Sequence, residues 1–248
     1  MGEIEGIYTV WLREMIRYFR QKERIISSLV MPVFWLLIFG GSMRSSIDIG
    51  NVDYKSFITP GVIAMSLMFT SVMSGISIIW DKEIGFMKEM LVSPVSRLSI
   101  VIGKALGTST TAIIQGIMVM LIAIATGLHI SIATFFLVIP VMLLISLGLV
   151  GIGLSIGSVM NNVEGFQLIM NFLVMPMFFL SGALFPINNL PTLLRIIPYI
   201  DPLTYGVELL RYMIVGVSSI PFITNFLIVS AFSTLTITLS AWLFSRRH

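Results

Sequence analysis

Long apolar stretches separated by short polar connections are the main pattern of this 248-residue chain. Each stretch has about the 20 residues that an α-helix needs to cross a bilayer, whose interior tolerates neither open backbone nor bare charge. The pattern therefore predicts an all-α integral membrane protein with six membrane-spanning helices. The predicted spans are Ile25–Met43, Phe57–Trp80, Ser99–Thr126, Ile132–Met160, Phe166–Ala183 and Phe222–Phe244.

Residues 1–24, ahead of the first predicted span, have the pattern of an amphipathic helix. Basic residues recur on one helical face at spacings of four, three and four, namely Arg13, Arg17, Arg20 and Arg24. Apolar residues line much of the other face, namely Ile4, Tyr8, Trp11, Met15 and Phe19. We expect this helix to lie in the headgroup plane with its basic face toward anionic lipid or a cytoplasmic partner. The alternative is a solvated basic segment whose positive charge only serves to keep the N-terminus in the cytoplasm.

The connection between the second and third predicted spans, residues 81–97, contains a shorter amphipathic pattern. Ile84, Met87 and Leu91 recur at positions i, i+3 and i+7, with charged residues between them. Pro94 disfavours a helical conformation at the preceding residue and so ends the helix. Ser96 can then cap the next helix. The pattern predicts a short helix held between two spans, with a plain interfacial turn as the alternative.

Residues 184–220 predict a re-entrant helical hairpin ahead of the last span. Four prolines divide this apolar segment into pieces too short to cross, namely Pro186, Pro191, Pro198 and Pro202. Asp201 is placed to cap the second piece, with Pro202 at its first position. Glu208 and Arg211 stand at i and i+3 and can pair. A disordered outer loop is the alternative, which the apolar composition disfavours.

The composition and the charge distribution agree with a polytopic membrane protein. Hydrophobic residues make up 56% of the chain and charged residues 11%, with a mean hydropathy of +1.00. Eleven of the 15 Lys and Arg residues fall on the side that carries both termini, which by the positive-inside rule is the cytoplasm. The net charge of +3 is therefore no sign of nucleic-acid binding. The first 24 residues are too charged for a cleavable signal peptide.

The sequence lacks the residues that several kinds of site would need. It has no Cys and no GxxxxGK[ST] motif, and its only histidines are His129 and His248. These absences exclude thiol chemistry, a P-loop nucleotide site and a His-based catalytic set. The middles of the spans hold no ionisable residue, which weakens a proton-antiporter interpretation without excluding sodium sites made of carbonyls and hydroxyls. Any transport energy is thus expected to come from outside the chain.

Small and polar residues inside the third and fourth spans predict helix packing rather than chemistry. Gly103 with Gly107, and Gly153 with Gly157, form GxxxG pairs, which let helices approach closely in lipid. Lys104 lies about one turn inside the third span, from where it can reach the inner surface. 

Two segments resemble the permease subunits of ABC type-2 exporters, the family of drug-resistance and polysaccharide export systems. One is TPGVIAMSLMFTSVMSGISIIWDKEIGFMKEMLVSPVSR with the following IVIGKALG, from Thr59 to Gly107. The other is DPLTYGVELLR, from Asp201 to Arg211. The resemblance extends over essentially the full length and implies a single ABC type-2 transmembrane domain, residues 1–248.

The resemblance implies a division of labour between chains. The permease would form a dimer, most simply a homodimer, in the plasma membrane of a prokaryote. Two copies of a separate P-loop ATPase would bind ATP and Mg, so that this chain needs no cofactor and is not itself an enzyme. The segment Asp81–Leu91 would be a coupling helix that fits a cleft on the ATPase. The residues expected to contact the ATPase are Lys82, Glu83, Phe86, Lys88 and Glu89.

The same resemblance assigns roles at the outer side and along the pathway. The outer hairpin would close the exit, with gate residues Asp201, Tyr205, Glu208 and Arg211. The pathway would be lined by Phe34, Phe39, Met170, Phe172, Met175 and Phe178. This apolar lining favours an amphiphilic drug-like, lipid-linked or glycan cargo. The alternatives are a gradient-driven secondary carrier, for example for sodium or drug efflux, and a non-transport membrane protein such as an assembly scaffold or an integral enzyme.

Overall fold

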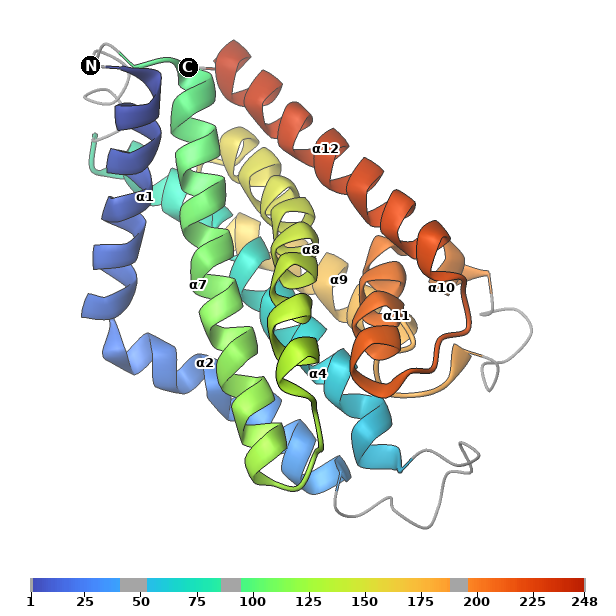
Figure 1. Cartoon of the computed structure of the whole chain (residues 1–248). Helices are drawn as coiled ribbons and strands as arrows, with labels where there is room; N and C mark the ends of the chain where they lie inside the picture. The colour runs from blue at the N-terminus through green and yellow to red at the C-terminus, as the bar shows by residue number, and fades with distance from the viewer. Residues whose placement is uncertain (1, 41–52, 86–94, 188–195, 248) are drawn as a thin grey trace.

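The computed structural model describes residues 2–40, 53–85, 95–187 and 196–247. Every regular element within these ranges is a helix, which confirms the all-α prediction (Figure 1). The helices are α1 (Glu3–Arg20), α2 (Lys22–Phe34), the π-helix η1 (Trp35–Phe39), α4 (Tyr54–Val72), α5 (Gly75–Glu83), α7 (Arg97–Ala125), α8 (Ile132–Val159), α9 (Val163–Leu180), α10 (Ile197–Ile200), α11 (Pro202–Val215) and α12 (Phe222–Arg247).

Within the described residues, five segments are long and apolar enough to cross a membrane. They are Tyr54–Glu83, Arg97–Ala125, Ile132–Val159, Val163–Leu180 and Phe222–Arg246. Each corresponds to one of the last five predicted spans. The first predicted span is represented by a shorter apolar helix, Ile25–Ile38, and its last residues fall outside the described part of the chain. Both chain termini lie at the same end of the bundle (Figure 1).

The first and second spans depart from regular α-helix. Pro32 lies within α2, and the π-helical turns of η1 follow it directly, which is a known way to accommodate a lost backbone N–H. The second span is broken at Met73 and Ser74, between α4 and α5. The break lies against α8, where a Cβ added to Gly153 would stand 2.3 Å from the carbonyl oxygen of Val72. Only glycine permits this approach of two backbones.

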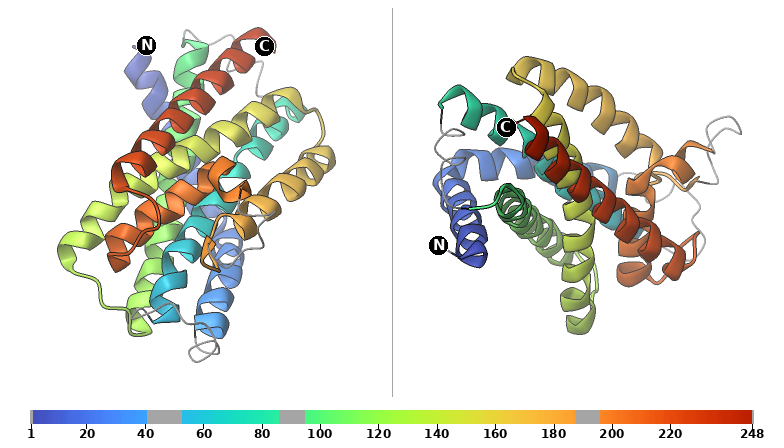
Figure 2. Two further views of the ribbon diagram at one scale, coloured as in Figure 1. Left: turned by 90° about the vertical axis from the view of Figure 1, so that its right-hand side faces the viewer. Right: turned by 90° about the horizontal axis from the view of Figure 1, so that it is seen from above.

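The glycine pairs of the third and fourth spans pack against different partners. Gly153 and Gly157 of α8 lie against the junction of α4 and α5. Gly103 of α7 lies against α1, where an added Cβ would stand 2.9 Å from the carbonyl oxygen of Ile7. The packing role predicted for both pairs is confirmed. On the far side of α8, α12 lies diagonally across it (Figure 2).

An amphipathic helix is present at the N-terminus, but it ends at Arg20, so that Arg24 belongs to α2, and its residues Arg13 and Arg17 are turned inward. The position predicted for it, in the headgroup plane, does not match its course along α7, which is long and apolar enough to span a membrane. α1 lies lengthwise beside the first half of α7 (Figures 1 and 2). The expectation that its basic stripe faces lipid or a partner is wrong for Arg13, which binds a buried carboxylate, and for Arg17, which stacks on Trp80. The residues exposed instead are apolar, namely Ile4, Tyr8, Leu12, Ile16 and Phe19. The carboxylate inside the bundle attracts the cations, and the apolar stripe is left outside.

The segment ahead of the last span forms two short helices, α10 and α11, which pack between α9 and α12 (Figure 1). α11 lies against α4, α8 and α12, and its residues Leu203–Arg211 are buried. An ordered, packed helix excludes the disordered-loop alternative for Pro202–Val215. Residues 188–195 of the predicted hairpin lie outside the described part of the chain.

Candidate functional site

A buried ion cluster stands near the end of α5, at Asp81, the first residue of the predicted coupling segment. The ammonium of Lys104 lies 2.5 Å from one carboxylate oxygen of Asp81, and the guanidinium of Arg13 lies 2.7 Å from the other. Lys104 also donates to the hydroxyl of Ser77 at 3.2 Å. The side chains of Asp81 and Lys104 are only 1% exposed. Asp81 therefore joins α5 to both α1 and α7.

The neighbouring residue, Lys82, ties the same turn of α5 to α8. Its ammonium donates to the carbonyl oxygens of Gly157, Ser158 and Met160 at 3.3, 2.8 and 3.1 Å. Gly157 and Ser158 belong to the last turn of α8 and Met160 is its C-cap residue. Carbonyls at a helix C-terminus have no partner within the helix, and the helix dipole favours a cation there. Asp81 and Lys82 together fasten the end of α5 to α1, α7 and α8.

The ion cluster was not predicted from the sequence, and it shows that the prediction made for Lys104 was wrong. Lys104 does not extend to the inner surface, because the carboxylate of Asp81 holds it inside the protein. The signal that could have found the pair was a lysine inside an apolar span and an aspartate at the inner end of the preceding one. A buried charge requires a partner of opposite sign.

The five residues predicted to contact an ATPase separate into three groups. The ammonium of Lys82 is hydrogen-bonded to carbonyl oxygens at the end of α8. Glu83 is exposed at the last residue of α5. Phe86, Lys88 and Glu89 lie outside the described residues, as does most of the predicted coupling helix.

Polar contacts also join the ends of α1, α7 and α12. The hydroxyl of Ser96 caps α7 by accepting from the backbone N–H of Ser99 at 3.1 Å, as predicted. Ser99 and Ser96 both donate to Glu3 of α1, and these hydrogen bonds lower the pKa of that carboxyl. Arg97 donates to the carbonyl oxygen of Ser245 at 2.6 Å. The end of the bundle near α5 is thus crosslinked around its circumference.

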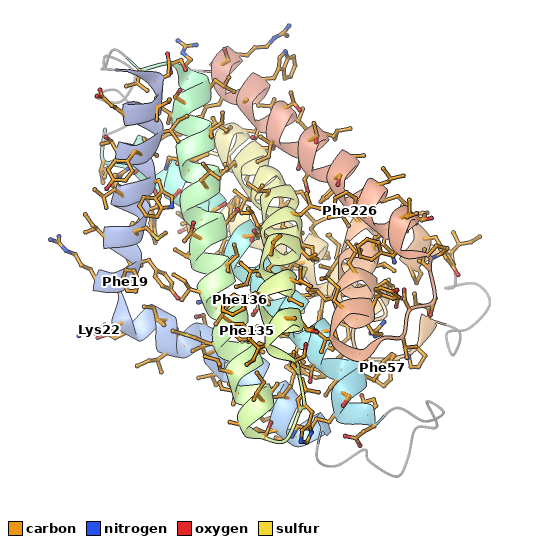
Figure 3. The ribbon with its side chains drawn as sticks, in the orientation of Figure 1. Phe19, Lys22, Phe57, Phe135, Phe136 and Phe226 are labelled. Atoms are coloured by element: carbon orange, nitrogen blue, oxygen red, sulfur yellow. The ribbon has the colours of Figure 1, made fainter. Side chains whose placement is uncertain are left out.

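A second buried ion pair lies in α11. Arg211 donates to Glu208, which confirms the predicted i, i+3 pair. The guanidinium also donates to the carbonyl oxygen of Gly182 at 2.7 Å and lies 4.0 Å from the ring centroid of Phe57. Figure 3 labels Phe57 where α4 passes α11. Arg211 therefore joins α11 to α4 and to the end of α9.

Glu208 extends the same network toward α12. It accepts from the hydroxyl of Ser218 at 2.8 Å and from the backbone N–H of Ser219 at 2.5 Å. Both serines belong to the connection that leads into α12. The carboxylate is 1% exposed, so these donors replace the water that it loses on burial.

Asp201 and Tyr205 organise the start of α11. Asp201 caps the helix by accepting from the backbone N–H of Leu203 at 2.9 Å, with Pro202 at the first position, as predicted. Burial raises the pKa of the Asp201 carboxyl to about 7. Tyr205 donates its hydroxyl to the carbonyl oxygen of Tyr199 at 2.6 Å, which fastens α10 to α11. All four predicted outer residues thus belong to one packed region.

A cavity of about 560 Å³ extends between the N-terminal helices α1 and α2 and the core helices α4, α5, α7 and α9. One wall is polar and includes Gln115, which accepts from Thr70 and donates to Ser28. Another part of the lining is aromatic, where Trp35 meets Phe178 and Phe179 edge to face. The cavity therefore has the two-sided polarity of an amphiphile.

The predicted pathway residues are only partly on this cavity. Met175 and Phe178 line it. Met170 is buried in the core, while Phe34 and Phe172 are 48% and 83% exposed on the outside of the bundle. The side chain of Phe39 is outside the described part of the structure. Among the described residues, no group of three or more His, Asp or Glu side chains could hold a metal ion.

Comparisons with known proteins point to one family of membrane transporters. The family model described as ABC-2 type transporter matches residues 5–215. Protein ycf38 of Cyanophora paradoxa, named as a transport permease, is 28% identical over 215 residues, covering 85% of this chain and 74% of that protein. The inner membrane transport permease YadH of Escherichia coli K12 is 23% identical over 227 residues, covering 89% and 87%.

A third relative shares a smaller part of its length. YbhR of Escherichia coli K12, named as a multidrug ABC transporter permease, is 28% identical over 176 residues, covering 71% of this chain and 48% of that protein. The family match spans most of the chain, including the ion cluster of α5 and the buried pair of α11. The chain belongs to the ABC-2 type transporter family.

Proposed function

We propose that this chain is the membrane-spanning subunit of an ATP-driven exporter and that a separate P-loop ATPase supplies the energy. Two permease copies, forming a homodimer, would work with two ATPase copies that bind ATP and Mg. Each permease would cross the plasma membrane of a prokaryote six times, with both termini in the cytoplasm. Family membership supports the permease role, and the chain has no P-loop motif of its own.

The observation that carries the proposal is the fastening of the last turn of α5. Asp81 and Lys82 bind α1, α7 and α8, and the segment that would contact the ATPase begins directly after them. A force applied to that segment would therefore move several helices together instead of bending one connection. In this scheme the ATPase contacts Glu83, Phe86, Lys88 and Glu89, and Lys82 keeps the segment attached to the bundle.

The outer end would respond to this movement. Arg211 and Glu208 connect α11 to α4, α9 and the start of α12. A shift of α11 would therefore move these neighbouring helices or break the contacts to them. In the proposed cycle the re-entrant region 184–220 closes the exit side, and nucleotide-driven rearrangement of the helices opens it. The aromatic wall and the polar wall of the cavity favour an amphiphilic cargo, drug-like or lipid-linked.

Co-purification from native membranes tests the proposal. A tagged wild-type chain is compared with Glu83→Lys and with Glu164→Lys, which changes an exposed carboxylate in the first turn of α9. We expect a P-loop ATPase to accompany the wild type and the Glu164 variant in equal amounts, and to be lost or reduced with Glu83→Lys. A permease that is purified without any ATPase and transports in response to an ion gradient would instead be a secondary carrier.

A further inference from the structure

The charges around one end of the cavity do not cancel. We call this the charged end, and its ionised side chains are Arg13, Glu14, Arg17, Asp81 and Lys104. Arg13 and Lys104 both bind Asp81, and the Oε1 atom of Glu14 lies 3.8 Å from the ammonium of Lys104. These four charges sum to zero. Arg17 is the fifth, and it leaves the charged end with a net charge of +1.

Arg17 faces the cavity without a carboxylate partner. Its guanidinium lies over the ring of Trp80, 5.0 Å from the centroid, and both residues line the cavity. Glu14 stands one turn earlier on α1, a spacing at which opposite charges commonly pair. Among the described residues, however, Arg17 has no carboxylate oxygen within 4.0 Å. A half-buried cation that stacks on an indole keeps its N–H groups available to an anion.

Two buried polar atoms of the cavity lining make no hydrogen bond to the described residues. The Oε1 atom of Glu14 and the hydroxyl of Ser74 are buried and have no hydrogen-bond partner among the described residues. Both residues line the cavity. A buried carboxylate oxygen without a donor costs free energy, so the charged end is arranged to receive a ligand that carries a donor as well as an anion.

The other end of the cavity is suited to a hydrocarbon chain. Trp35, Phe178 and Phe179 form its aromatic wall. Met31 of α2 and Met175 of α9 also line it, and both are about half exposed on the outside of the bundle, 57% and 45%. The lining of this end therefore includes partly exposed apolar side chains of both α2 and α9.

We propose that this cavity is a binding site for one phospholipid-like amphiphile, whose phosphate binds Arg17 and whose headgroup hydroxyl donates to Glu14. The apolar chain lies along the aromatic wall and leaves the protein between Met31 and Met175. The volume of about 560 Å³ is within the usual range for ligand sites and accommodates a headgroup with the adjoining part of a chain. The site needs no ATPase, so its test is independent of the function proposed above.

Native mass spectrometry of the purified, delipidated chain measures this binding directly. The protein is titrated with phosphatidylglycerol, phosphatidylcholine and diacylglycerol that carry identical acyl chains. Phosphatidylglycerol has both a phosphate and a hydroxyl donor, phosphatidylcholine has only the phosphate, and diacylglycerol has only the hydroxyl. We expect one molecule of phosphatidylglycerol to bind, about 10-fold more tightly than phosphatidylcholine and more tightly still than diacylglycerol.

Variants assign the two contacts. Arg17→Gln should lower the affinity for phosphatidylglycerol about 10-fold, and Arg17→Lys should retain most of it. Glu14→Gln should reduce phosphatidylglycerol binding toward the phosphatidylcholine level, because a neutral amide is a weaker acceptor. The matched control is Arg20→Gln, which removes an exposed cation of α1 that does not line the cavity, and it should leave the affinity unchanged. Size-exclusion chromatography verifies that each variant is folded.

Three results would overturn the assignment. Equal binding of diacylglycerol and phosphatidylglycerol would mean that no phosphate is recognised. An equal loss in Arg20→Gln and Arg17→Gln would mean that the basic helix attracts anionic lipid without using the cavity. Binding of many equivalent lipids with no one-to-one complex would mean that lipid covers the apolar surface non-specifically.

Discussion

The ammonium of Lys104 lies 2.5 Å from the carboxylate of Asp81, with both side chains 1% exposed in the interior of the bundle. The two residues belong to different helices and stand 23 positions apart in sequence. Isolated burial of either charge would be very costly, so each makes the other tolerable. Asp81 lies close to the proposed ATPase contact. The pair therefore stabilises the fold and also holds the proposed contact segment to α7.

Removing one partner of this pair should destabilise the protein more than removing both. Asp81→Asn removes the carboxylate that Lys104 contacts at 2.5 Å and leaves only Glu14, whose Oε1 atom lies 3.8 Å away, a change expected to cost about 3–5 kcal/mol. The double variant Asp81→Asn with Lys104→Met should recover much of that loss, because the two changes are coupled. Thermal unfolding in detergent measures both. Additive losses in the double variant would show that the two charges do not depend on each other.

The pair in α11 should behave similarly at the opposite end of the structure. Glu208→Ala removes the partner of Arg211 and the acceptor for Ser218 and Ser219, so we expect a destabilisation of about 3–5 kcal/mol. Glu164→Ala, at an exposed site, should change the free energy of unfolding by no more than about 0.5 kcal/mol. Equal midpoints of thermal unfolding for the two variants would contradict a structural role for Glu208.

The raised pKa of Asp201 predicts a pH dependence of stability. Burial shifts the pKa of this carboxyl from an ordinary value of 3.8 to about 7, so the folded state holds its proton over that interval while the unfolded state loses it. The contribution of Asp201 to stability therefore decreases as the pH rises from about 4 to about 7. Asp201→Asn keeps an oxygen that can cap α11 but does not titrate.

The comparison of these two proteins isolates the effect of Asp201. The midpoint of thermal unfolding of the wild type should fall relative to that of Asp201→Asn as the pH rises from about 4 to about 7. Above about pH 7 the difference between the two midpoints should stay constant. A difference that does not vary with pH would mean that the carboxyl titrates normally in the folded protein.

The close approach of α8 to the break between α4 and α5 should not tolerate a side chain. A Cβ at Gly157 would stand 2.4 Å from the carbonyl oxygen of Gly75, so Gly157→Ala should destabilise by about 1–3 kcal/mol through overpacking. Gly2→Ala places a methyl group where no atom lies within 4 Å, and it serves as the control. Unchanged thermal stability of Gly157→Ala would contradict the backbone contact.

Local patterns predicted local structure well. Apolar runs gave the positions of the last five spans, because the bilayer imposes length and polarity on each helix separately. The cap at Asp201 and the pair of Glu208 with Arg211 were also predictable, since each depends on residues two or three positions apart. The gate role proposed for residues 184–220 rests on the resemblance to a family, because no spacing rule assigns a gate.

Long-range partners could not be predicted in the same way. Arg13 and Asp81 are 68 positions apart, and only the packing of α1 along α7 brings them together. Helical periodicity correctly placed the arginines of α1 on one face but could not tell whether that face points inward. The glycines of α7 contained the necessary information, because a groove of small residues is a place for another helix to dock.

One measurement asks whether nucleotide bound at the ATPase changes the structure of α11 through Asp81. Hydrogen exchange of α11 is followed in the complex of permease and ATPase, with and without a non-hydrolysable ATP analogue. We expect the analogue to alter exchange in Pro202–Val215 of the wild type, and we expect Asp81→Asn to bind the ATPase but to lose this response. The same response in Asp81→Asn, or none in the wild type, would contradict the claim that the α5 end transmits the signal.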